Sequence, residues 1–187
     1  MKKKEIQDNN VSMKSSTMQK ANDLHKKGIN HLNQSNFDQA IFYIKKAISL
    51  NNKVSLYWNN LGVAYIKSGK IDDAFNAFKQ SIDHDPNNAE SYNNIGNINL
   101  KQKELKEAVL NFNKSISIMP SFVEPYNGLA SVFVATNEIS KAYEVLENAL
   151  KLDPNHLLVL KNMGKVEKNL GKVKMAKSRF EIILSLF

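Results

Sequence analysis

Hydrophobic and small residues recur along the chain with a period of 34 residues from Ala21 onward. A small residue stands at the same position in the second half of every unit, with no insertion between units: Ala40, Ala74, Ala108, Ala142 and Ala176. When each unit is numbered from 1 to 34, position 4 is always large and apolar or aromatic: Leu24, Trp58, Tyr92, Tyr126 and Leu160. A fixed period of this length predicts an array of stacked supersecondary units.

Two helices are predicted in each unit. Position 8 is small, position 17 is apolar and position 24 is large and apolar; the second unit carries Gly62, Ile71 and Phe78 there. The pattern predicts an all-α chain, with helices at positions 1–14 and about 17–31 of each unit, and turns near residues 35, 69, 103, 137 and 171. A proline, which cannot continue a helix, stands near the end of three units: Pro86, Pro120 and Pro154. The five units span residues 21–54, 55–88, 89–122, 123–156 and 157–187.

The second unit carries the residues that point to a family. Its packing and turn positions hold Trp58, Leu61, Gly62, Tyr65, Gly69, Ala74, Phe78 and Pro86. This order closely resembles the tetratricopeptide repeat, a helix–turn–helix unit with a W-x2-L-G-x2-Y…A-x3-F…P signature. The resemblance extends from residue 21 to the end of the chain. It implies a right-handed superhelical solenoid of five stacked repeats, in which no repeat buries its hydrophobic face alone.

Position 11 departs from the pattern. It is Tyr65 in the second unit, but His31 in the first, Asn99 in the third and Glu167 in the fifth. A polar first unit is consistent with an N-terminal cap. Because the tyrosine is missing from the third and fifth units, we expect looser packing there.

The two ends of the chain differ from the repeats between them. Residues 1–20 are polar and lack helical periodicity, so they are predicted to form a disordered basic tail. The last helix ends in an apolar run with no polar helix after it: Ile182, Ile183, Leu184, Leu186 and Phe187. We expect this helix to pack against a partner or a second copy, or to continue into a longer protein; frayed apolar residues are the alternative.

The charge distribution argues against a nucleic-acid site. The formal net charge is +8, but residues 157–187 carry seven basic and two acidic residues, whereas residues 123–156 carry two and five. Of the 26 basic residues 25 are lysine, and Arg179 is the single arginine. Sites that read phosphate or base edges favour the planar fork of arginine. We therefore expect no nucleic acid among the partners, and an RNA-binding helical repeat is the weakest functional interpretation.

The sequence contains no catalytic or metal-binding motif. It has no cysteine, and its four histidines lack the spacing of helical metal pairs: His25, His31, His84 and His156. Neither a G-x-S-x-G elbow nor a Walker-type loop is present, and no cofactor is implied. No apolar run reaches the roughly 18 residues of a membrane span, and the N-terminal segment lacks the apolar core of a secretory signal. We therefore expect a non-enzymatic, cytoplasmic protein.

Asparagines recur on the first helices, at positions 5 and 6, which tetratricopeptide arrays place on their concave wall. An asparagine side chain has one acceptor and two donors, so a column of them can hold the backbone of an extended peptide. This column resembles the asparagine ladder in the repeats of O-linked N-acetylglucosamine transferases. An asparagine-rich composition is the alternative explanation. The predicted groove consists of Asn59, Asn60, Asn93, Asn94, Asn97, Asn127, Lys161 and Asn162.

These features favour a protein-binding scaffold whose concave groove holds an extended peptide or partner protein. The alternative is the substrate-targeting arm of a glycosyltransferase, or of another enzyme, whose catalytic part lies outside these residues. The identity of the partner does not follow from the sequence.

Overall fold

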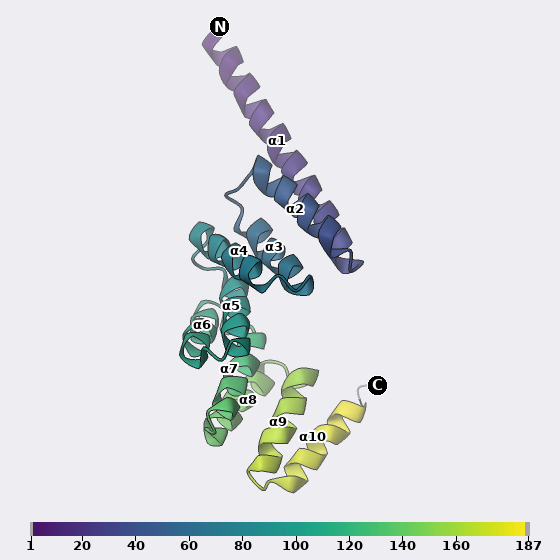
Figure 1. The fold of residues 1–187 in the computed structure, drawn as a ribbon, viewed down its shortest axis with the longest axis vertical. Helices are drawn as coiled ribbons and strands as arrows, with labels where there is room; N and C mark the ends of the chain where they lie inside the picture. The colour runs from purple at the N-terminus through teal and green to yellow at the C-terminus, as the bar shows by residue number, and fades with distance from the viewer. Residues whose placement is uncertain (1, 186–187) are drawn as a thin grey trace. The chain divides into compact units, whose positions relative to one another are not determined.

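The computed structural model describes the backbone of residues 2–185 and the side chains of residues 15–185. Within that range the chain forms ten helices and no strand (Figure 1). Contacts between Cα atoms divide the chain into two units, Met1–Ser91 and Tyr92–Phe187. The helices are α1 (Lys2–Asn33), α2 (Phe37–Leu50), α3 (Ser55–Lys67), α4 (Ile71–His84), α5 (Ala89–Lys101), α6 (Leu105–Ile118), α7 (Glu124–Ala135), α8 (Ile139–Leu152), α9 (Leu157–Asn169) and α10 (Val173–Ser185).

The helices confirm the predicted register of the repeats. In the second repeat, α3 occupies positions 1–13 and α4 occupies positions 17–30. The same bounds recur in the other repeats to within a residue at the helix ends, except that α1 begins earlier. Each repeat is therefore one helical hairpin, and the all-α repeat fold expected from the sequence is correct.

Helix α1 begins at Lys2, well before the first repeat (Figure 1). This helical backbone differs from the disordered tail that the sequence analysis expected for residues 1–20. No proline or glycine occurs in that segment, so nothing in it breaks a helix that continues backwards from the first repeat. Among the residues whose side chains are described, residues 15–20 are exposed and Ala21 is the first that is fully buried.

The turn inside each repeat has one conformation throughout the chain. The residue at position 15 has a positive φ, between 60° and 80°, in all five repeats. In the second repeat, Lys70 N–H donates to the Tyr65 carbonyl (2.9 Å) and Gly69 N–H donates to the Ile66 carbonyl (3.1 Å). These two bonds form a Schellman motif, and the equivalent pair closes the other four turns. The residues with positive φ are Ser35, Gly69, Lys103, Asn137 and Gly171, at the predicted turn positions.

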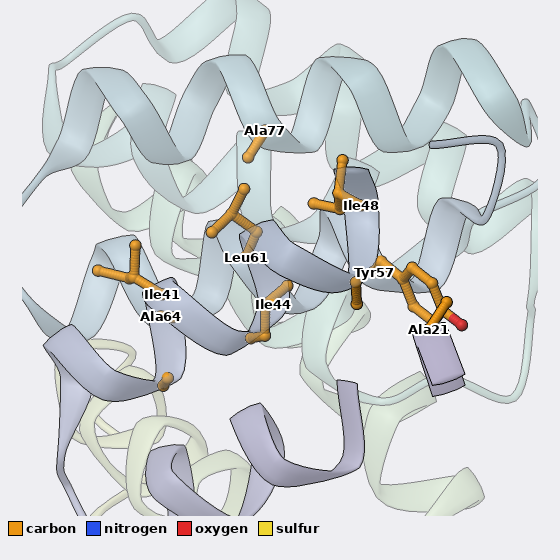
Figure 2. Packing of buried hydrophobic residues seen from close by; sticks show 10 residues of the cluster. Ala21, Ile41, Ile44, Ile48, Tyr57, Leu61, Ala64 and Ala77 are labelled. Atoms are coloured by element: carbon orange, nitrogen blue, oxygen red, sulfur yellow. The ribbon is translucent and has the colours of Figure 1, made fainter. Parts of the chain in front are cut away.

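The helices of a hairpin are in close contact at positions 8 and 24. A Cβ atom at Gly62 would lie 2.5 Å from the ring of Phe78, and one at Gly96 would lie 2.8 Å from the ring of Phe112. No side chain fits at such a distance, so glycine allows the second helix to place a large side chain against the first. In unit 1 this packing forms one buried cluster, to which α1, α2 and α3 contribute Ala21, Ile44, Ile48 and Leu61 (Figure 2).

Positions 11 and 23 hold side chains of matching character in four of the five hairpins. His31 stacks on Tyr43 with ring centroids 5.3 Å apart, whereas Phe133 and Val145 share an apolar cluster. In the third repeat Asn111 Nδ2 donates to Asn99 Oδ1 (3.2 Å).

The fifth repeat places an ion pair at positions 11 and 23. Arg179 Nε donates to Glu167 Oε1 (3.3 Å), and Glu167 is fully buried. Its other oxygen, Oε2, has no partner among the described residues. Both Asn99 and Glu167 are therefore buried against a polar residue of the second helix, and the looser packing expected at these positions stays a prediction.

Replacing Lys103 with glycine should stabilise the protein. A non-glycine residue in the left-handed region costs about 1–2 kcal/mol, which glycine removes. Glycine also makes the unfolded chain more flexible, and this offsets about 0.4–1 kcal/mol of the gain. We expect the free energy of unfolding to rise by roughly 0.5–1 kcal/mol in urea titrations. The control, Lys79→Gly in the middle of α4, should lose roughly 0.5–1 kcal/mol. Unchanged or lower stability of the Lys103 variant would mean that this turn carries no strain.

The Glu167–Arg179 pair should be replaceable by an apolar pair but should not tolerate the loss of the arginine alone. Arg179→Val leaves a buried carboxyl group without its partner, which costs about 3–5 kcal/mol when such a pair is broken. The double variant Glu167→Phe/Arg179→Val copies Phe133 and Val145 of the fourth repeat, and it should recover most of that loss. The coupling free energy between the two side chains is measured by denaturant unfolding of the wild type, Arg179→Val, Glu167→Phe and the double variant. Additive losses would contradict the pairing.

Candidate functional site

Some asparagines of the predicted groove hold the repeats together. Asn59 is 1% exposed. Its Nδ2 donates to Glu90 Oε2 (2.8 Å) and its Oδ1 accepts from Ser91 Oγ (3.0 Å), at the start of α5. This side chain therefore joins one repeat to the next and offers almost no surface to a ligand.

Hydrogen bonds join position 5 of one repeat to position 6 of the following repeat. Asn60 Nδ2 donates to His25 Nε2 (2.9 Å), and Asn162 Nδ2 donates to Asn127 Oδ1 (2.8 Å). In both cases the two residues are 35 positions apart in the sequence, one more than the length of the repeat. Part of the predicted asparagine column therefore forms an internal seam, a row of hydrogen bonds between the first helices of adjacent repeats.

Asn93 interrupts this seam. It is buried, and its Oδ1 has no hydrogen-bond partner among the described residues. The residue 35 positions further on is Gly128, which has no amide to donate. A Cβ at Gly128 would lie 2.4 Å from the ring of Phe112, so a side chain cannot replace the glycine there without displacing the ring. The ring of Phe112 occupies the space that an asparagine would need.

The other predicted groove residues retain accessible surface. Asn97 and Lys161 are exposed, and Asn60, Asn94, Asn127 and Asn162 are half-buried. For these six the groove stays a prediction, whereas the side chains of Asn59 and Asn93 lie in the interior.

An apolar cavity of about 170 Å³ lies between α7 and α9, on the side formed by the first helices of the fourth and fifth repeats. We call it the α7–α9 cavity. Asn162 is the only predicted groove residue in its lining; the apolar members of the lining were not predicted. The cavity is lined by Ala130, Ser131, Val134, Leu146, Asn162, Lys165, Val166 and Asn169.

The cavity lies where the pairing of positions 8 and 24 changes. In the third repeat the ring of Phe112 fills the space between Gly96 and Gly128. The fourth repeat has Ala130 in place of the first glycine and Leu146 in place of the phenylalanine. Leucine is shorter than phenylalanine, so the space that a ring would occupy is left open. This exchange of two residues was visible in the sequence and is the signal that could have located the cavity.

The rim of the cavity is polar and basic. Lys165 and Asn169 lie one turn apart on α9, beside Asn162. Lys161 is one turn before Lys165 on the same helix face. Lys161, Lys165 and Lys168 are all exposed, and none has an ion-pair partner among the described residues.

A second depression, of about 580 Å³, lies between the two turns of unit 1. Its lining is mostly polar and exposed, and includes Ser35, Asp38, Lys67 and Lys70. Phe37 is its one large apolar side chain, so it offers less apolar surface to anchor a ligand than the α7–α9 cavity does. The α7–α9 cavity is therefore the stronger candidate site.

The described residues contain no cluster of three or more metal-ligating side chains. None of the described helices is long and apolar enough to cross a membrane. His25 stacks on Tyr57 (4.6 Å between ring centroids) and His84 stacks on Trp58 (6.3 Å), so packing explains both histidines.

Helix α10 carries exposed apolar side chains. Val173, Met175, Phe180 and Leu184 are exposed, and Ile182 and Ile183 are half-buried. Leu186 and Phe187 lie outside the described residues. Self-association through this helix stays a prediction.

Acid should destabilise the protein through His25. Burial lowers the pKa of His25, because it disfavours the charged ring, and a proton on Nε2 would remove the acceptor of the Asn60 bond. A folded-state pKa below the unfolded value means that this stability is present above about pH 6.5 and is lost as the pH falls.

The variant His25→Asn tests this directly. Asparagine is the residue at position 5 of the next three repeats, can still accept from Asn60, and does not titrate in this range. Between about pH 8 and about pH 5, urea unfolding should show a larger loss of stability in the wild type than in the variant. Equal losses would exclude His25 as the source.

Comparisons with known proteins agree with this architecture. A sequence profile of the tetratricopeptide repeat matches residues 24–54, 89–122 and 123–156, and a second profile, for the TPR repeat, matches residues 62–103. No curated protein sequence matches the chain significantly.

Several solved structures share the fold. A crystal structure of MamA protein is 22% identical with a TM-score of 0.71, over 89% of this chain and 91% of that one. The PilF protein of Pseudomonas aeruginosa is 19% identical with a TM-score of 0.83, over 91% and 78%. MamA of Desulfovibrio magneticus RS-1, from residue 41, is 20% identical with a TM-score of 0.73, over 89% and 94%. From the profiles, which match more than half of its residues, the chain belongs to the tetratricopeptide repeat family.

Proposed function

We propose that the protein is a non-enzymatic scaffold that binds an extended segment of a partner protein at the α7–α9 cavity. The observation that carries the proposal is the cavity itself, in which buried Ala130, Leu146 and Val166 form an apolar floor beneath an edge of exposed residues that are mostly polar. Ligand sites in proteins combine apolar walls with a few placed polar groups in this way. A side chain of the partner would occupy the cavity, and its backbone would lie along the rim.

The rim offers both halves of a peptide-binding contact. Asn127 Oδ1 accepts from Asn162 Nδ2, and this is the one hydrogen bond that the two side chains make among the described residues. Asn127 Nδ2 and Asn162 Oδ1 are thus left as one donor and one acceptor. An extended peptide presents a carbonyl and an N–H that match such a pair. The ladder expected from the sequence would therefore act through this pair.

The bond between the two asparagines also favours a preformed site. It fixes both side chains, which would otherwise lose rotamer freedom when the ligand binds. The contact between α7 and α9 holds the two helices at the cavity together. Both observations favour a site whose helices are already in place before the ligand binds.

Filling the cavity should weaken binding without harming the fold. The double variant Ala130→Gly/Leu146→Phe restores the glycine–phenylalanine pair of the second and third repeats. In the second repeat, Gly62 and Phe78 are also followed by an asparagine at position 6 of the next repeat, as Asn162 follows here. The new ring should therefore fit where the partner's side chain would otherwise bind.

The test selects a displayed library of random peptides on the full chain and measures the enriched peptides by fluorescence anisotropy. The double variant should weaken them by roughly tenfold or more, because an apolar side chain loses its burial. The control is Leu110→Phe, which adds the same ring at an exposed leucine of α6. Circular dichroism should show equal helicity in all three proteins. If no peptide is enriched, or if the filled variant binds the enriched peptides as well as the control does, the proposal is wrong.

A further inference from the structure

We infer that the partner segment is acidic, and that it inserts one aliphatic or phenyl-sized side chain into the α7–α9 cavity while neighbouring carboxylates contact Lys161 and Lys165. This inference rests on the proposed function and specifies the chemistry of its ligand. Two independent observations carry it, the size of the cavity and the charge of α9.

The volume of the cavity selects the side chain. A cavity of about 150 Å³ lined by aliphatic residues is large enough to hold benzene, and this one measures about 170 Å³. A leucine, isoleucine, methionine or phenylalanine side chain therefore fits, whereas alanine would leave most of the space empty. The apolar floor also excludes a charged group from the cavity, because desolvating a charge without a partner is unfavourable.

The charge of α9 selects what surrounds that side chain. The helix contains one acidic residue, Glu167, and its side chain is fully buried and paired with Arg179. Its other charged residues, Lys161, Lys165 and Lys168, are exposed. Lys165 lines the cavity, and Lys161 lies one turn away on the same face. A ligand in the cavity therefore meets only positive charge from this helix.

The uncompensated charge extends to the whole fifth repeat, which carries seven basic and two acidic residues. One further lysine is already engaged, since Lys172 Nζ lies 3.7 Å from the centre of the Tyr143 ring. The lysines beside the cavity have no such partner. Their charge is therefore available to steer and hold an acidic segment.

A peptide explains the site better than a nucleic acid does. The only arginine is occupied in the pair with Glu167. The cavity lining contains no aromatic side chain on which a base could stack. A nucleic acid would contact the lysines, but the apolar cavity beside them would add nothing to its binding.

The experiment uses labelled peptides Ser-Glu-Asp-Xaa-Asp-Glu-Ser with leucine, phenylalanine or alanine as the guest Xaa. Neutral peptides, with asparagine and glutamine in place of the acids, are the counterparts. Anisotropy on the full chain should show the acidic leucine and phenylalanine peptides binding roughly tenfold more tightly than the alanine peptide. The acidic peptides should also bind more tightly than their neutral counterparts, and added salt should reduce that advantage.

Two variants separate the two halves of the inference. Lys161→Gln/Lys165→Gln should weaken the acidic peptides by roughly threefold to tenfold and leave the neutral ones unchanged. Lys79→Gln, an exposed lysine of α4, is the control for the change in charge. The filled variant Ala130→Gly/Leu146→Phe should remove the advantage of leucine and phenylalanine over alanine and leave the advantage of the acids.

The possible failures are distinguishable. If neutral peptides bind as tightly as acidic ones and the filled variant still weakens both, the acidic ligand is wrong and the proposed function stands. If neither the designed peptides nor the displayed library binds the wild type, both are wrong. If a labelled single-stranded oligouridine binds more tightly than every peptide, depends on Lys161 and Lys165 and is indifferent to the filled cavity, the lysines serve nucleic acid and this inference is overturned.

Discussion

The close approach of the two helices at positions 8 and 24 is the contact on which the rest of each repeat depends. At Gly62 and Gly96 a single added carbon would lie within 3 Å of an aromatic ring, so the ring packs directly on the backbone of the first helix. That contact fixes the separation of the helices at one point, and the left-handed residue at position 15 fixes how the chain reverses between them. The left-handed residue recurs in all five repeats and a small residue stands at position 8 of each, so the hairpins share one geometry although most of their side chains differ.

Within that geometry, the two side chains that face each other across a hairpin are matched in polarity in four of the five repeats. Positions 11 and 23 face each other, and they hold two rings in the first repeat, two amides in the third, two apolar side chains in the fourth and an ion pair in the fifth. Asn99 and Glu167 looked unfavourable when position 11 was considered alone, because each is a polar residue on a buried face. A buried polar group is tolerated when its partner is present, and the partner in each case is twelve residues further along the chain.

The sequence predicted the fold well because its strongest signals are local. Period, glycine, proline and apolar positions determine where each helix begins and ends, and the five turns lie at the predicted residues. The site was harder to predict because it depends on contacts between repeats. The sequence placed Asn59 and Asn127 at equivalent positions of the first helices, but not that Asn59 is buried against α5 while Asn127 stays half-exposed. The cavity was missed for a similar reason: Leu146 is informative only once its contact with position 8 is known.

Selective binding by a repeat array has to arise where the repeats differ. Residues common to all repeats produce similar surfaces along the array, and such surfaces cannot distinguish one segment of a ligand from another. The fourth and fifth repeats depart from the others in two respects that meet on one surface: Ala130 with Leu146 leaves a cavity, and Lys161 with Lys165 places charge beside it. The shorter leucine forfeits dispersion contacts that a ring would make. A ligand side chain would restore those contacts when it binds, so the packing defect supplies part of the binding free energy.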